Sequence, residues 1–198
     1  MTGRDTRRDG QDARIADGKD LASLRADGPA APGLPDLRPR GLQVSQPESD
    51  FLARLGPLLP TPRAAKRLVN LYRLVRISIP EAELTEFAGT GGGAPYQVVQ
   101  VLLAILVGSP AAAARVFREI ASGPADGDIT TLLAKLGAEN GEGNRGCAAI
   151  STVVKRLAQD TDLVTRTGEY QQWCPQLARY SFHTRELAAG LSGAVPGK

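Results

Sequence analysis

The segment that most constrains this chain is an apolar run of ten residues at 98–107, interrupted only by Gln100. Pro95 precedes the run and a Gly-Ser-Pro tripeptide follows it at 108–110, so a helix can begin at the first proline and should end before the second. A helix that is apolar nearly all round must be covered on several sides, and this one is too short to span a membrane. The sequence therefore predicts a buried central helix over residues 96–107.

The segments around this helix are typical of an all-helical protein. Ser45 followed by Glu48 fits a capping box, and Asp128 is a suitable cap for a further helix. Short amphipathic segments separated by proline and glycine continue toward residue 188, and only the neighbourhood of Val164 is compatible with a strand. We predict an all-α fold, an irregular bundle of six to eight short helices.

The two ends of the chain differ in composition from the middle. Residues 1–41 contain no aromatic side chain, have nearly balanced charges and include several proline and glycine residues. Such a segment buries too little apolar surface to offset the entropy lost on ordering. The predicted organisation is a disordered or loosely attached segment at 1–41, a helical domain at 42–188 and a flexible tail at 189–198.

Composition argues against several kinds of active site. The formal net charge of +3 does not by itself indicate nucleic-acid binding, and His183 is the only histidine. The two cysteines, Cys147 and Cys174, are expected to be reduced core thiols. We predict no catalytic residue and no metal ligand.

The charged N-terminus lacks an apolar signal region, so we expect a cytoplasmic location and no membrane partner.

Residues 61–76 combine residue type, spacing and charge in a way that indicates a binding site. Thr61 is a good N-cap, and Pro62 suits the first helical position. No acidic residue occurs between Asp50 and Glu81, so nothing local is expected to neutralise the six positive charges in between. At 100° per residue, the apolar side chains share one face of the helix. The opposite face carries four cations and one amide, namely Arg63, Lys66, Arg67, Arg73 and Asn70.

This cationic face has two interpretations. The plainest is a solvated helix surface, with Glu81, Glu83 and Glu86 as the nearest acidic side chains that could pair with it. The other is an anion-binding site, because Arg63 and Lys66 lie in the first turn, where free N–H groups and the helix dipole already favour phosphate. Basic residues oppose the usual preference for acids in a first turn, which favours a ligand or a partner.

The string from Thr61 to Arg73 resembles a segment that follows the nucleotide-binding domain in KAP-type P-loop NTPases of bacteria. There the segment belongs to a helical C-terminal lid, and its leading arginine resembles the sensor-2 arginine that approaches the terminal phosphate of the nucleotide. The resemblance implies that role for Arg63. Residues 173–182 are similar to the chain end of the same proteins in actinobacteria, and the likeness covers roughly residues 34–185.

The motifs that bind nucleotide in such ATPases are missing from this sequence. A P-loop needs Gly-x-x-x-x-Gly-Lys-Ser/Thr, and neither this string nor an apolar strand ending in an acidic pair occurs. Residues 141–146 match Gly-x-Gly-x-x-Gly, but they follow a predicted helix end rather than a buried strand, so we interpret them as a loop. The resemblance therefore implies a lid without its ATPase, and no cofactor bound by this chain alone.

Three functions are compatible with these observations. The first is a non-catalytic, lid-like module that works with a P-loop ATPase made as a separate chain, with ATP bound only in their complex. The second is a nucleic-acid-binding helical module, although Tyr72 falls on the apolar face and not among the cations. The third is a protein-interaction bundle or a gene remnant.

Trp173 is expected to pack in the core, with docking as the alternative, and Arg179 is a candidate phosphate or partner contact.

Overall fold

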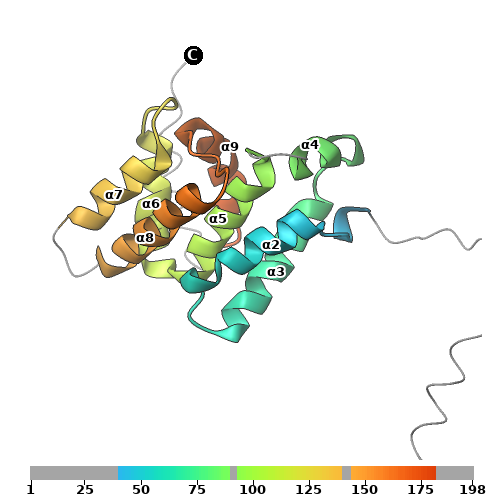
Figure 1. Cartoon of the computed structure of the whole chain (residues 1–198), viewed down its shortest axis with the longest axis horizontal. Helices are drawn as coiled ribbons and strands as arrows, with labels where there is room; N and C mark the ends of the chain where they lie inside the picture. The colour runs from blue at the N-terminus through green and yellow to red at the C-terminus, as the bar shows by residue number, and fades with distance from the viewer. Residues whose placement is uncertain (1–39, 90–92, 140–143, 182–198) are drawn as a thin grey trace, which may run out of the picture. The chain divides into compact units, whose positions relative to one another are not determined.

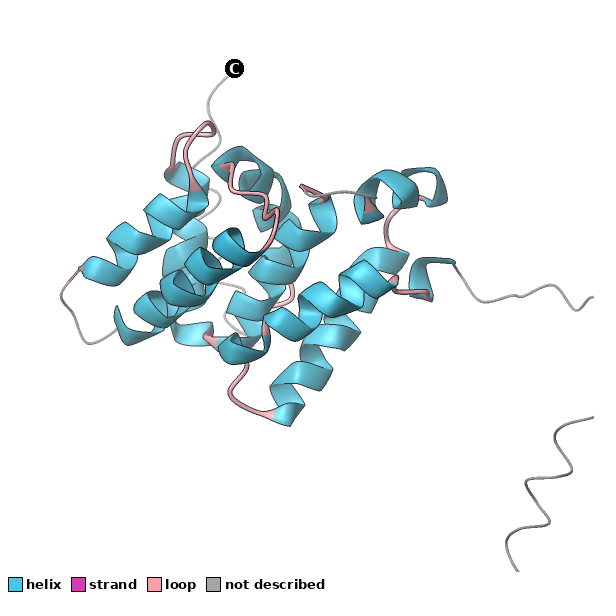
Figure 2. Cartoon of the chain, viewed as in Figure 1, coloured by secondary structure: helices cyan, strands magenta, loops and turns pink. Residues whose placement is uncertain are grey.

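The computed structural model of the chain describes residues 40–89, 93–139 and 144–181 (Figure 1). Within these ranges every regular element is a helix and none is a strand (Figure 2). Eight of the described elements are α-helices, which confirms the predicted all-α bundle. The predictions for residues 1–39, for residues 141–143 of the predicted loop and for residues 182–198 lie outside the described residues. Residues 144–146, which are also part of the loop predicted at 141–146, are helical instead and form the first residues of α8, because that helix begins at Asn144.

Short connections join the helices. In chain order the elements are η1 (Arg40–Leu42), α2 (Gln46–Arg54), η2 (Gly56–Leu58), α3 (Pro62–Ile77), η3 (Glu81–Glu83), α4 (Leu84–Ala88), α5 (Pro95–Gly108), α6 (Pro110–Ser122), α7 (Ile129–Ala138), α8 (Asn144–Asp160) and α9 (Thr167–Ala178), where η denotes a 3-10 helix. The turn η1 includes residues 40 and 41, which are predicted from sequence to belong to the N-terminal segment. Because Arg76 Nη1 of α3 donates to Gly41 O at 3.0 Å, this turn is packed against the bundle.

Side-chain caps set the starts of three helices. The Ser45 main-chain N–H donates to Glu48 Oε2 at 2.7 Å, within the capping box that opens α2. Thr61 Oγ1 accepts from the N–H of Ala64, the third residue of α3, at 3.1 Å. Asp128 Oδ1 accepts from the N–H of Thr131, the third residue of α7, at 2.8 Å. Residue type alone identifies all three caps, so these helix starts are determined locally.

Helix α5 is the core of the described unit. Every side chain from Tyr96 to Val107 is buried, which confirms the predicted central helix. It packs against α2, α3, α4, α6 and α9. Figure 1 shows α5 between the α2–α3 pair and α6. Among the described helices, none combines the length and the apolar character that crossing a membrane requires.

The connection between α8 and α9 corrects one sequence expectation. Around Val164 the chain is extended, but within the described residues it forms no strand. A single antiparallel bridge joins Asp128 to Arg166 instead, and the Ile129 N–H donates to Thr165 O at 2.8 Å. The pairing stops there because α7 and α9 both begin immediately afterwards, which leaves no length for a ladder.

Candidate anion-binding face of helix α3

Helix α3 exposes positive charge from its first turn onward. Thr61 caps the helix, Pro62 occupies the first position, and the first turn contains no acidic residue. Arg63 and Lys66 are both exposed. Their charges add to the positive end of the helix dipole, where acids would normally offset it. Pro62 has no N–H and Thr61 accepts the N–H of Ala64, so an anion at this end would meet the side-chain cations and the positive end of the helix dipole.

Three of the four predicted cations lie exposed on one side of α3. They are Arg63, Lys66 and Arg73, and none of them forms an ion pair with any other residue that the structure describes. The helical period places Leu74 and Ile77 on the same side, where 54% and 43% of their surface is exposed. One exposed apolar side chain is ordinary, but two beside three free cations form a surface suited to a partner.

The fourth predicted cation, Arg67, contacts the chain beyond the end of α9. Its Nη2 donates to Tyr180 O at 3.3 Å, and partial burial lowers its pKa. The guanidinium of Arg179 lies 5.5 Å from the centre of the Tyr180 ring, and its Nε donates to Gln176 O at 2.8 Å. Two predicted site residues that are distant in sequence, Arg67 and Arg179, thus meet at one tyrosine.

Arg76 contradicts the expectation that nothing neutralises the cations of this region. It is buried, and its Nε donates to Glu48 Oε1 of α2 at 2.8 Å. The reason is helical geometry: Arg76 follows Tyr72 by one turn and so lies on the buried side of α3. The same periodicity places Leu74 on the exposed side, so the helical period accounts for the positions of both Arg76 and Leu74. It does not identify Glu48 as the partner of Arg76, because that contact depends on how α2 packs.

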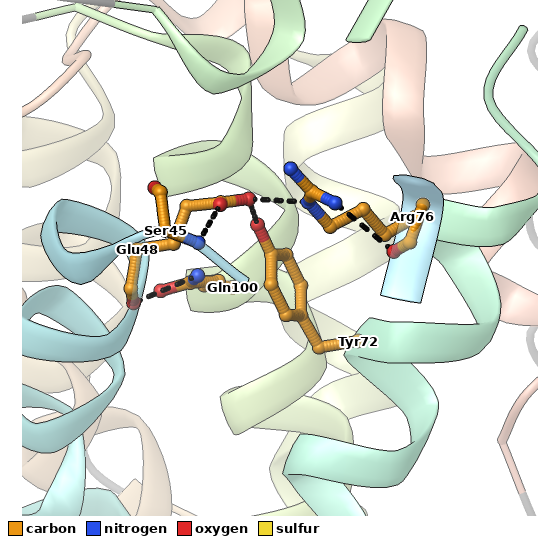
Figure 3. A network of polar contacts seen from close by, with 6 residues as sticks. Ser45, Glu48, Tyr72, Arg76 and Gln100 are labelled. Atoms are coloured by element: carbon orange, nitrogen blue, oxygen red, sulfur yellow. Dashed lines mark hydrogen bonds and ion pairs between the residues drawn. The ribbon is translucent and has the colours of Figure 1, made fainter. Parts of the chain in front are cut away.

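Glu48 is the centre of a buried polar network (Figure 3). Besides the contact with Arg76, the Tyr72 hydroxyl donates to Glu48 Oε1 and the Ser45 N–H donates to Oε2. Gln100 of α5 donates through Nε2 to the Glu48 main-chain oxygen at 3.1 Å. Burial raises the pKa of Glu48, but the hydrogen bonds from Tyr72, Ser45 and Arg76 outweigh burial and hold the pKa below its usual value. The carboxylate is therefore ionised and engaged at both oxygens.

This network holds the fold and is not a reaction centre. Burial, together with the Glu48 carboxylate, raises the pKa of Tyr72, so the hydroxyl stays protonated and remains a donor. Glu48 has no solvent-exposed surface, whereas a catalytic acid or base must reach a substrate. The network instead connects η1, α2, α3 and α5, and it fixes the orientation of α3.

Neither a reactive thiol nor a cluster of three metal ligands occurs among the described residues. Cys147 and Cys174 are free and buried, as expected. Burial raises the pKa of both thiols, that of Cys174 to about 12, and such thiols are poor nucleophiles at neutral pH. Within the described ranges, no three His, Cys, Asp or Glu side chains are placed to share a metal ion. His183 lies outside those ranges.

Trp173 is half-buried on α9, in contact with Phe87 of α4. Their ring centroids are 5.7 Å apart at an interplanar angle of 61°. Phe87 in turn stacks on Tyr72, with centroids 6.4 Å apart. The three rings form an aromatic row from α3 through α4 to α9. Trp173 thus packs against the bundle, and it also lines a groove between α4 and α9.

No protein-family model matches this chain, and neither the curated proteins nor the solved structures include a significant match. A functional proposal for the chain therefore rests on the chemistry of its own residues and on the motif resemblance of residues 61–73.

Proposed function

We propose that this chain is a non-catalytic helical module that binds an anionic partner through the exposed side of α3. One observation carries the proposal: Arg63, Lys66 and Arg73 are exposed together and are unpaired within the part of the chain that the structure describes. Like charges one turn apart on a helix repel each other. Binding of an anion removes that repulsion and adds charge-assisted hydrogen bonds.

The most specific form of the proposal is a lid that acts on a P-loop ATPase made as a separate chain. In this form Arg63 approaches the terminal phosphate of ATP held by the ATPase, as its resemblance to a sensor-2 arginine implies. Lys66 and Arg73 extend the contact along the helix. ATP is bound only in the complex, since this chain has no P-loop. The unpaired cysteines and the nucleotide partner fit a cytoplasmic setting.

The side chains beside the cations favour a protein partner over a nucleic acid. Sites that bind nucleic-acid strands interleave aromatic groups with positive charges, and Tyr72, the aromatic residue of α3, is buried. The exposed neighbours are Leu74 and Ile77, which can pack against a protein surface. The nucleic-acid-binding module is accordingly the second candidate, and an interaction bundle that ignores nucleotide is the third.

The test compares Arg63→Ala with Arg118→Ala, an exposed arginine of α6 that serves as the matched control. Calorimetry would measure binding of the full chain to the P-loop ATPase encoded nearest to its gene, with and without a non-hydrolysable ATP analogue. We expect Arg63→Ala to weaken the nucleotide-dependent association about ten-fold or more, because one charge-assisted contact is lost. Arg118→Ala should bind like the wild type.

Other outcomes separate the alternatives. Equal affinity with and without nucleotide would favour the plain interaction bundle. Binding to mixed-sequence DNA or RNA that falls steeply with salt, and that weakens equally when Lys66, Arg67 or Arg73 is replaced by alanine, would favour the nucleic-acid module. If every variant behaves like the wild type in every assay, the cations of α3 form only a solvated helix surface. That result is expected of a gene remnant.

A further inference from the structure

A second surface, of opposite charge, lies between α4 and α9. It is a groove with a volume of about 370 Å³. Its apolar members come from four separate parts of the chain and are Ile79, Phe87, Pro95 and Trp173. Its polar members are Glu83, Glu86, Glu169, Gln172 and Gln176. The groove thus combines an apolar lining with acidic and amide groups, and it includes no cation.

All the charge in this groove is negative. Glu83 and Glu86 are exposed at the start of α4, and Glu169 is half-buried in the first turn of α9. None of the three carboxylates forms an ion pair with a residue in the described ranges. The groove is thus negatively charged, although the chain as a whole carries a formal charge of +3. A ligand that complements the charge of the groove is therefore positively charged.

The spacing of the carboxylates favours an organic cation over a metal ion. Acidic side chains that hold a metal converge on one point, and among the described residues no such convergence of three occurs. Trp173 instead supplies an aromatic surface, and Phe87 holds its ring in place at 5.7 Å. Tryptophan is the best aromatic partner for a cation, and the apolar lining suits the alkyl stem that lysine and arginine carry.

We infer that this groove binds a lysine or arginine side chain presented by a basic segment of a partner protein. The alkyl stem lies against Trp173 and Phe87, and the charged group lies among the carboxylates of Glu83, Glu86 and Glu169. The exposed cations of α3 take no part, so this inference does not depend on the proposed function.

The single tryptophan of the chain gives a direct test, because its fluorescence reports on this groove alone. The full chain would be titrated with an octapeptide of alternating arginine and glycine, which has no aromatic residue. The matched control replaces each arginine of the peptide with aspartate. We expect a saturable change in Trp173 emission with the basic peptide only, and a binding midpoint that rises with ionic strength.

Charge-removing variants complete the test. Glu86→Gln and Glu169→Gln keep the size of the side chain and should each weaken binding about two- to five-fold, as expected for a partly exposed ion pair. Glu119→Gln on α6 is the control, since Glu119 is exposed and outside the groove. Thermal melting checks that each variant is folded. The inference is overturned by an absent response, by an equal response to the aspartate peptide, or by unchanged binding in the Glu86 and Glu169 variants.

Discussion

Glu48 shows how one residue can serve two levels of structure. Its Oε2 accepts the Ser45 N–H and so completes the cap of α2, while its Oε1 accepts from Tyr72 and Arg76 of α3. A buried carboxylate persists only when hydrogen bonds and a counter-charge offset its lost hydration. Local helix capping and the tertiary contact between α2 and α3 therefore depend on the same side chain.

Loss of the counter-charge should be costly. We expect Arg76→Ala to lower the free energy of unfolding by about 3–5 kcal/mol, because the Glu48 carboxylate stays buried without its cation. Arg73→Ala, on the exposed side of the same helix, should change that free energy by less than about 0.5 kcal/mol. Urea denaturation followed by circular dichroism measures both. Similar losses in the two variants would contradict the structural role of the buried ion pair.

Glu48 also makes the fold sensitive to acid. Hydrogen bonds that outweigh burial hold its pKa below the ordinary value in the folded state, so the unfolded chain takes up this proton more readily. The resulting stability is fully present above the unfolded carboxyl pKa of about 4.3, and it is lost as pH falls through the lower pKa of the folded state. The free energy of unfolding, measured by urea denaturation at a series of pH values, should therefore decline below about pH 4.3. The free energy of unfolding of the Glu48→Gln variant should decline less steeply over the same range. Parallel declines would assign the acid sensitivity to other carboxylates.

At the scale of the elements, α3 shows what periodicity predicts and what it does not. The cap at Thr61 and the exposure of Arg63, Lys66 and Arg73 follow from residue type and spacing, and the structure agrees with them. The partner of Arg67, which is Tyr180 O, follows from the docking of α9. A repeat of 3.6 residues assigns a side chain to a face, but it contains no information on which element covers that face.

The acidic groove illustrates the same limit. The sequence predicts that Trp173 packs in the core, with a docking surface as the alternative. Its neighbours Glu86 and Glu169 belong to α4 and α9, which are far apart in the chain. Only the packing of these helices brings the two carboxylates to one groove, so no local pattern could indicate it.

The contact between α5 and η2 gives a prediction at the element scale. A Cβ added at Gly108 would overlap the Leu58 main-chain oxygen and lie 2.9 Å from its carbonyl carbon. Main-chain atoms cannot rotate away as a side chain can, so Gly108→Ala should lower the free energy of unfolding by about 1–3 kcal/mol. Gly56→Ala is the matched control, because no heavy atom lies within 4 Å of a Cβ there. Equal melting temperatures for the two variants would contradict this close packing.

At the scale of the whole described unit, two surfaces of opposite charge share one core. Tyr72 lies on the buried side of α3, whose other side carries the free cations, and Trp173 lines the acidic groove. Phe87 contacts both rings and so links the elements that carry the two surfaces. Because packed aromatic rings hold their positions, the helices that carry the two surfaces are held in place without a ligand. Two charged surfaces on one packed core are compatible with the proposed binding of a partner.

The proposed binding role predicts that the chain does not hydrolyse ATP by itself. Phosphoryl transfer depends on positioning the phosphates and magnesium, and this sequence has neither a P-loop nor an acidic strand end for the metal. Phosphate release from magnesium-ATP with the purified chain should match a buffer blank. Adding the P-loop partner should start ATP turnover, at a rate above that of the partner alone. Arg63→Ala should reduce this increase in rate, whereas Arg118→Ala should not. Steady turnover by the chain alone, abolished when the protein is heated, would place catalysis within it and contradict the accessory role.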